Sequence, residues 1–147
     1  MIKVRVQEAR FNLSEELDAL RADGVGAIVS FQGIVRDTEG DLVALELEHY
    51  PAMTVGQIEE HCKTALKKWS LGGLTVIHRY GKLEPKDDIM MVAVSAEHRQ
   101  AAFDAASFLM DYLKSRAPFW KKEHRLSGTS WVLPRREDEM ALNRWDY

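Results

Sequence analysis

Residues 110–123, MDYLKSRAPFWKKE, bring together side chains that can bind an anion. Between Lys114 and Arg125 there are five Lys/Arg residues and a single acid, Glu123, although the whole chain has a net charge of −3. A basic segment in an acidic chain suggests a focused anion site more than a broad surface for a polyanion. Phe119 and Trp120 lie within the segment and supply aromatic surface beside the lysines.

Two different elements must position these lysines. Apolar residues recur with helical spacing from Ala101 to Tyr112, which predicts a helix. Pro118 cannot continue a helix, so the chain leaves it near 116 and starts a strand at Phe119. Lys114 then lies on the last helical turn and Lys121 just past the proline corner, where both lysines can converge on one anion. Two simpler interpretations remain open: a helix C-terminus favours cations, and a Lys-Lys pair often lies on a solvated or edge-protecting face.

Composition limits the class of protein. With 147 residues, 46% hydrophobic and 29% charged, we expect one domain over residues 1–147. We find no stretch of about 18 apolar residues and no secretory signal, and therefore expect a cytoplasmic protein without a membrane span. Cys62 lies on an apolar helical stripe and is expected to be an inert core thiol. The sequence has no His/Cys spacing typical of a zinc site and no common nucleotide-binding motif. We therefore expect neither a metal nor a cofactor.

Periodicity in the rest of the chain predicts strands and helices in mixture. The apolar-polar alternation of Val43, Leu45 and Leu47 predicts a sheet with one wet face. Thr54 and Gln57 have capping-box spacing, and Ser95 can cap the following helix. The expected strands are 2–6, 27–31, 43–48, 74–80, 89–95, 119–125 and 129–133, and the expected helices are 14–21, 54–69 and 95–116. His78 alternates with apolar neighbours and is interpreted as a structural residue.

Further cations could complete the anion site. Arg36 stands at the mouth of a core strand, where it either binds a ligand or pairs with Asp37. His98 is sixteen residues before Lys114 on one predicted helix, a separation of roughly 24 Å. One small ligand cannot touch both ends. Either the chain has two unrelated basic spots, or His98 and Arg99 of one subunit complete the lysine site of another in a C2 dimer.

Five segments make the chain resemble the catalytic (large) subunit of molybdopterin synthase. They are FQGIVRD (31–37), LEHYPAMT (47–54), VIHRYGKLEP (76–85), SAEHRQAAFDA (95–105) and MDYLKSRAPFWKKE (110–123). They occur in order across nearly the whole chain after Gly24. The resemblance implies an α+β, α/β-hammerhead-type fold with an additional antiparallel β-subdomain.

The resemblance also implies a sulfurtransferase. A homodimer of large subunits would bind a small ubiquitin-like sulfur carrier at each end, forming a heterotetramer. The carrier's C-terminal Gly-Gly tail bears a thiocarboxylate, and two sulfurs are transferred to cyclic pyranopterin monophosphate to form the dithiolene of molybdopterin. By motif, the catalytic residues are Lys114 and Lys121; the substrate-binding residues are Arg36, His98, Arg99 and Arg135, with Arg136 as the alternative to Arg135; and the tail channel is lined by Phe31 and Met110.

These residue types suit that chemistry. Arginine and lysine bind phosphate well, and a fixed lysine can stabilise the negative charge that develops during attack by a thiocarboxylate. Two other classes remain open. One is a non-catalytic anion- or nucleotide-binding module, and the other is a scaffolding dimer whose lysines serve solubility. Nucleic-acid binding is not expected, because the basic segment is short and the chain is acidic.

Overall fold

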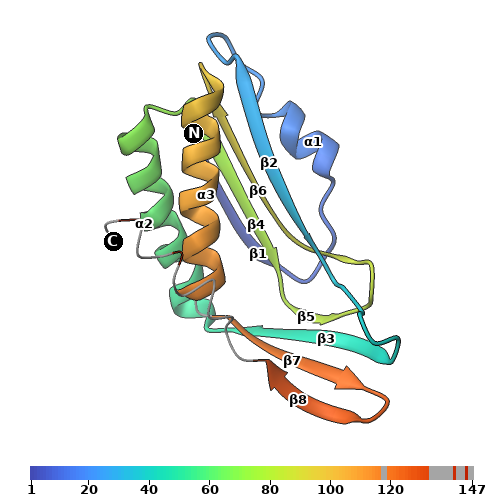
Figure 1. The fold of residues 1–147 in the computed structure, drawn as a ribbon. Coiled ribbons are helices and arrows are strands. Elements are labelled where there is room, and N and C mark those ends of the chain that lie inside the picture. The colour runs from blue at the N-terminus through green and yellow to red at the C-terminus, as the bar shows by residue number, and fades with distance from the viewer. Residues whose placement is uncertain (117–118, 133–140, 142–144, 146–147) are drawn as a thin grey trace.

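The computed structural model describes residues 1–116, 119–132, 141 and 145. Within them the elements follow the chain as β1 (Ile2–Gln7), α1 (Leu13–Asp18), β2 (Ala27–Ile34), β3 (Leu42–His49), α2 (Pro51–Trp69), β4 (Gly73–Arg79), β5 (Gly81–Leu83), β6 (Asp88–Ala96), α3 (Arg99–Ser115), β7 (Phe119–Arg125) and β8 (Gly128–Val132). Figure 1 shows their arrangement. Among these residues no helix is long and apolar enough to cross a membrane.

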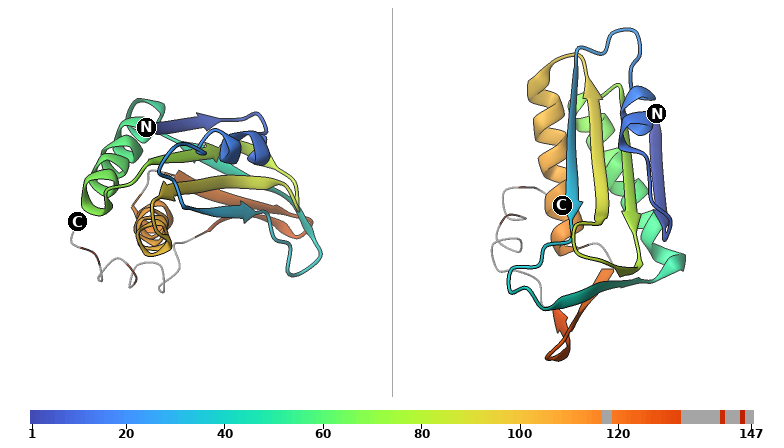
Figure 2. Two further views of the ribbon diagram at one scale, coloured as in Figure 1. Left: turned by 90° about the horizontal axis from the view of Figure 1, so that it is seen from above. Right: turned by 90° about the vertical axis from the view of Figure 1, so that its right-hand side faces the viewer.

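Sheet A is a mixed sheet with the strand order β1-β4-β6-β2. β1 runs parallel to β4, and the other two pairings are antiparallel. Helices α2 and α3 lie along one face of the sheet and α1 lies on the other (Figure 2). Val76 and Val92 pack in the core cluster that includes the helical residues of α2 and α3, whereas Ile77 and Met91 pack towards Leu17 of α1. Because both faces are covered, every residue of β4 is buried.

Sheet B is an antiparallel sheet with the order β5-β3-β7-β8. It lies across the end of sheet A, at the bottom of the view in Figure 1. Its inner face carries Leu47, which is 1% exposed, and its outer face carries Trp120 and Trp131, which are exposed. The expected α+β, hammerhead-type fold with an additional antiparallel sheet is therefore confirmed.

Two predicted helix caps are wrong because nearby backbone groups compete for the same side chains. α2 begins at Pro51, so Thr54 lies inside the helix and its hydroxyl donates to the Tyr50 carbonyl at 2.7 Å. Strand β6 continues to Ala96, and the Ser95 hydroxyl donates to the Gly73 carbonyl at 3.3 Å across sheet A. The N-cap of α3 is His98, whose side chain makes no capping hydrogen bond.

The facing predicted for β3 is wrong at one residue. An irregularity between Leu42 and Ala44 shifts the pairing with β7. As a result Val43 is 54% exposed while Leu42 and Ala44 are buried. A bulge of this kind changes the side on which a side chain emerges. From Leu45 onward the predicted alternation is recovered, because Leu47 faces the core.

Candidate functional site

The two lysines of the basic segment lie where predicted, on the last turn of a helix and near the start of a strand. Lys114 is the basic residue in the last turn of α3, whose C-cap Arg116 donates its backbone N–H to the Tyr112 carbonyl at 2.7 Å. Lys121 is the third residue of β7 and lies opposite Leu47 of β3. Both lysines are partly buried. Residues 117–118 of the corner lie outside the described residues.

Both lysines act electrostatically on the same buried imidazole. His78, in β4, is 4% exposed. Burial lowers the pKa of His78 to about 3, against the opposing effect of a hydrogen bond to the Arg79 carbonyl, and the charges of Lys121 and Lys114 lower that pKa further. Charges interact this way only over short distances. The Phe119 ring stacks on His78 with centroids 3.7 Å apart, so β7 starts next to the end of β4, and the last turn of α3 is near enough for Lys114 to act on the same imidazole.

The expected tail-channel residues lie on neighbouring elements. Met110 is one helical turn before Lys114 on α3 and packs against the main core. Phe31 is on β2, the edge strand of sheet A, opposite Val92, and is 37% exposed. Helix α3 packs against β2 and β6. Phe31 and Met110 thus lie on two elements that pack against each other.

Arg36 follows β2 on a short, well-anchored segment. The preceding Val35 is buried and is tied by its backbone to Asp87 and Lys86 at 2.9 and 2.8 Å. The Arg36 side chain is exposed. The Asp37 carboxylate instead accepts the backbone N–H groups of Gly40 and Leu42, at 2.9 and 3.2 Å. Asp37 is thus engaged by the loop backbone and by Arg125, and no Arg36–Asp37 ion pair is found among the described residues.

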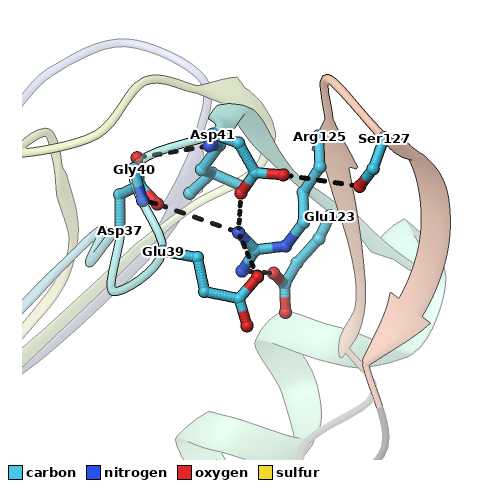
Figure 3. A network of polar contacts seen from close by, with 8 residues as sticks. Asp37, Glu39, Gly40, Asp41, Glu123, Arg125 and Ser127 are labelled. Atoms are coloured by element: carbon cyan, nitrogen blue, oxygen red, sulfur yellow. Dashed lines mark hydrogen bonds and ion pairs between the residues drawn. The ribbon is translucent and has the colours of Figure 1, made fainter.

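A salt-bridge network that the sequence analysis did not identify holds the loop after Arg36 to sheet B. Figure 3 shows Arg125, at the end of β7, among the carboxylates of the 37–41 loop. Its guanidinium lies 2.6 Å from Asp41, 3.6 Å from Glu39 and 3.8 Å from Asp37, and it also pairs with Glu123. These partners raise the pKa of Arg125. Only an excess of acids in the loop pointed to this network in the sequence.

His98 and Arg99 are not brought to the lysines within one chain. They lie at the N-terminal end of α3, are exposed, and His98 pairs with the neighbouring Glu97 at 3.4 Å. Lys114 lies at the other end of the same helix, roughly 24 Å away. Any joint action on one ligand needs a second chain. Arg135 and Arg136 lie outside the described residues.

Thiol chemistry at Cys62 and metal binding find little support in the described part of the chain. Cys62 is fully buried, and burial together with the charge of Glu59 raises the pKa of its thiol to about 12. The prediction of an inert core thiol is confirmed, because such a thiol remains protonated and has no access to a substrate. Within the described residues no group of three or more His, Cys, Asp or Glu side chains could hold a metal ion.

Comparison with known proteins gives a consistent result. Residues 6–116 match the family model described as MoaE protein. The molybdopterin synthase catalytic subunit of Mesorhizobium japonicum is 54% identical over 147 residues, covering 97% of this chain and 92% of that protein. The solved molybdopterin biosynthesis MoaE protein from Burkholderia ambifaria is 44% identical with a TM-score of 0.84, covering 99% of this chain and 98% of that one. A complex of subunits 1 and 2 of the molybdopterin-converting factor from Helicobacter pylori shares the fold, with a TM-score of 0.74 at 22% identity over 91% of both chains.

Proposed function

The chain belongs to the MoaE family of molybdopterin synthase catalytic subunits, and from that premise we propose that it transfers sulfur to cyclic pyranopterin monophosphate at a site built around Lys114 and Lys121. It is an enzyme that converts this substrate to molybdopterin. The observation that supports the site assignment is that both lysines lie near the same buried residue: their charges lower the pKa of His78, and its ring stacks on Phe119, two residues before Lys121.

Each lysine has a role that its position suits. Lys114, one turn after Met110 on α3, stabilises the negative charge that develops as the partner's thiocarboxylate attacks the substrate. Lys121, on the rigid strand β7, binds the anionic substrate or donates a second proton. Arg36 binds the cyclic phosphate through its guanidinium. Two sulfurs arrive from two successive thiocarboxylates, because the buried Cys62 offers no thiol that could carry sulfur.

The proposed partners are those that the family resemblance implies. We propose that a small ubiquitin-like sulfur-carrier subunit inserts its C-terminal Gly-Gly tail between Phe31 and Met110. The Helicobacter pylori relative was solved as a complex of two different subunits, which supports a heteromeric assembly. A homodimer would bring His98 and Arg99 of one chain to the lysines of the other, with Arg135 or Arg136 as a further substrate contact. A cytoplasmic location remains a prediction.

Single-turnover sulfur transfer tests the proposal. The purified chain is mixed with a thiocarboxylated small subunit and cyclic pyranopterin monophosphate, and the dithiolene product is quantified. We expect product with the native chain, and for Lys114→Ala a rate about 100- to 1000-fold lower, the usual loss for one transition-state charge stabiliser. Lys67→Ala is the matched control, because Lys67 lies on the last turn of α2.

A comparison of two neighbouring lysines of β7 makes the test more specific. Lys121 and Lys122 are adjacent but emerge on opposite faces of the strand, and Lys122 lies over the Trp131 ring at 4.5 Å. Lys121→Ala should lose most of the activity while Lys122→Ala keeps it. Partner binding without sulfur transfer by the native chain would instead favour the binding-module or scaffolding alternative.

A further inference from the structure

Two of the five segments that carry the family resemblance have no role in the reaction so far, yet the structure brings them together. LEHYPAMT contributes His49 at the end of β3, and VIHRYGKLEP contributes His78 and Tyr80 at the end of β4. The two histidine rings lie against Phe119, the first residue of β7, and the Tyr80 ring packs on His49. The His78 ring stacks on the Phe119 ring with centroids 3.7 Å apart and an interplanar angle of 15°. The His49 ring lies 4.6 Å from Tyr80 and 5.9 Å from Phe119. We call His49, His78 and Tyr80 the Phe119 seat.

Strand register connects this seat to the lysine site. In the antiparallel β3–β7 pair, His49 is opposite Phe119 and Leu47 is opposite Lys121. Residues two apart on a strand emerge on the same face, and directly opposed residues share a face. Phe119 and Lys121 therefore lie side by side on the inner face of sheet B. Because Phe119 and Lys121 are two residues apart on β7, packing of the Phe119 ring helps to fix the backbone that carries Lys121.

The orientation of the His78 imidazole is fixed by a hydrogen bond. Its Nδ1 lies 2.8 Å from the Arg79 carbonyl, which can only accept, so Nδ1–H is the donor. The ring is uncharged at neutral pH, because burial lowers its pKa to about 3. An uncharged ring can stack on Phe119 without adding a positive charge beside Lys114 and Lys121.

The His49 imidazole is held by a two-step chain. The Thr54 hydroxyl donates to the Tyr50 carbonyl at 2.7 Å, and its oxygen therefore accepts from His49 Nδ1–H at 3.2 Å. Thr54 is fully buried, which makes this support rigid. Burial lowers the pKa of His49 as well. Both histidines thus present a neutral ring of defined orientation to Phe119.

We propose that His49 and His78 are positioning residues for Lys121: with Tyr80 they form the seat that holds the Phe119 ring and so fixes the start of β7. The proposal rests on the proposed function, since it assigns Lys121 to the reaction. Both histidines act through Phe119 and need not touch the substrate. The requirement is a flat, uncharged ring at each position and not an imidazole nitrogen.

Paired substitutions distinguish a ring requirement from a nitrogen requirement. His78→Phe and His49→Phe keep a flat ring, while His78→Ala and His49→Ala remove it. We expect kcat for sulfur transfer about 10- to 100-fold lower in each alanine variant, the range that small misplacements of reacting groups cause. Each phenylalanine variant should remain within about threefold of native. His124→Ala is the control, because His124 belongs to the same strand but faces away and pairs with Glu46 at 2.7 Å.

Two results would overturn the seat. One is native kcat in a folded His49→Ala variant, which removes a half-buried ring and is therefore expected to fold even if His78→Ala does not. The other is a folded His49→Phe or His78→Phe variant as slow as its alanine counterpart, which would assign the role to an imidazole nitrogen.

An NMR measurement separates this proposal from the proposed function. In the purified chain, the side-chain signals of Lys121 should shift in His49→Ala and His78→Ala but not in His124→Ala. That readout needs no substrate. If the native chain transferred no sulfur while these shifts were seen, the proposed function would fail and the seat would stand. Unchanged Lys121 signals in both alanine variants would contradict the seat even in an active enzyme.

Discussion

Asp41 accepts a hydrogen bond of 2.6 Å from Arg125, and this contact joins the loop after β2 to the far end of β7. Asp37 and Glu39 of the same loop also face this guanidinium, at 3.8 and 3.6 Å, as Figure 3 shows. Arg36 is the residue immediately before the loop. The proposed phosphate contact and the strand that carries Lys121 are therefore mechanically linked through one ion-pair network.

We predict that Arg125→Met raises the KM for cyclic pyranopterin monophosphate by about three- to tenfold with little change in kcat, because uniform binding is lost when Arg36 is displaced. Steady-state kinetics at several ionic strengths measure this effect. Arg21→Gln is the control, because Arg21 belongs to an exposed i,i+3 pair with Asp18 on the surface. A native KM in a folded Arg125→Met variant would show that the network does not position Arg36.

Cys62→Ala should spare sulfur transfer while lowering the free energy of unfolding by about 1–2 kcal/mol, the cost of removing a small buried side chain. Cys62 is fully buried and burial raises the pKa of its thiol to about 12, so it cannot act as a persulfide carrier at neutral pH. Urea unfolding measures the stability and single-turnover transfer measures the activity. Loss of transfer in the folded variant would contradict external sulfur delivery.

The stability of the protein should fall below about pH 6.5 because of His78. Its pKa is about 3 in the folded state, below the ordinary value of 6.5, so the unfolded chain binds the proton more readily between these two values. The stabilisation is complete above pH 6.5 and decreases as the pH falls towards 3. At pH 5 the loss from this one group amounts to roughly 2 kcal/mol.

Comparison with His78→Phe isolates this contribution, because phenylalanine cannot be protonated. The difference in the free energy of unfolding between the native chain and His78→Phe should change by roughly 2 kcal/mol in favour of the variant between pH 8 and pH 5. Denaturant titrations of both chains at each pH measure it. A difference that does not vary with pH would mean that His78 is not shielded from protonation as described.

The predicted dimer can be tested by complementation between chains. Lys114→Ala and Arg99→Ala should each inactivate a homodimer. In a purified heterodimer of the two variants, one site contains the native Lys114 of one chain and the native Arg99 of the other, so about half of the native activity should return. If each chain used its own Arg99, both sites of the heterodimer would be defective and no activity would return.

Local sequence signals predicted the elements that carry the lysines. The helical spacing from Ala101 to Tyr112 and the break at Pro118 correctly place Lys114 on the last turn of α3 and Lys121 on β7. Helix periodicity and proline stereochemistry depend on residues a few positions apart, so a single sequence contains them. The buried stripe through Cys62 was predicted for the same reason.

Predictions that depended on competition for a hydrogen bond were wrong. Ser95 has the residue type of a helix cap, but its hydroxyl bonds to Gly73, which is 22 residues away in the chain and adjacent in sheet A. Thr54 has capping-box spacing, but Pro51 starts the helix one turn earlier. A side chain forms a hydrogen bond with the group that folding places next to it. Local sequence spacing does not predict which group that is.

The sequence by itself determined the family, the α+β class and the elements on which the candidate residues lie. The tertiary structure decided which of those residues meet. His78 and Phe119 are 41 positions apart and become stacked only because β3 pairs with β7 and sheet B crosses the end of sheet A. The physical reason is that propensity and periodicity act over a few residues, whereas strand pairing and side-chain packing join segments with no relation in sequence.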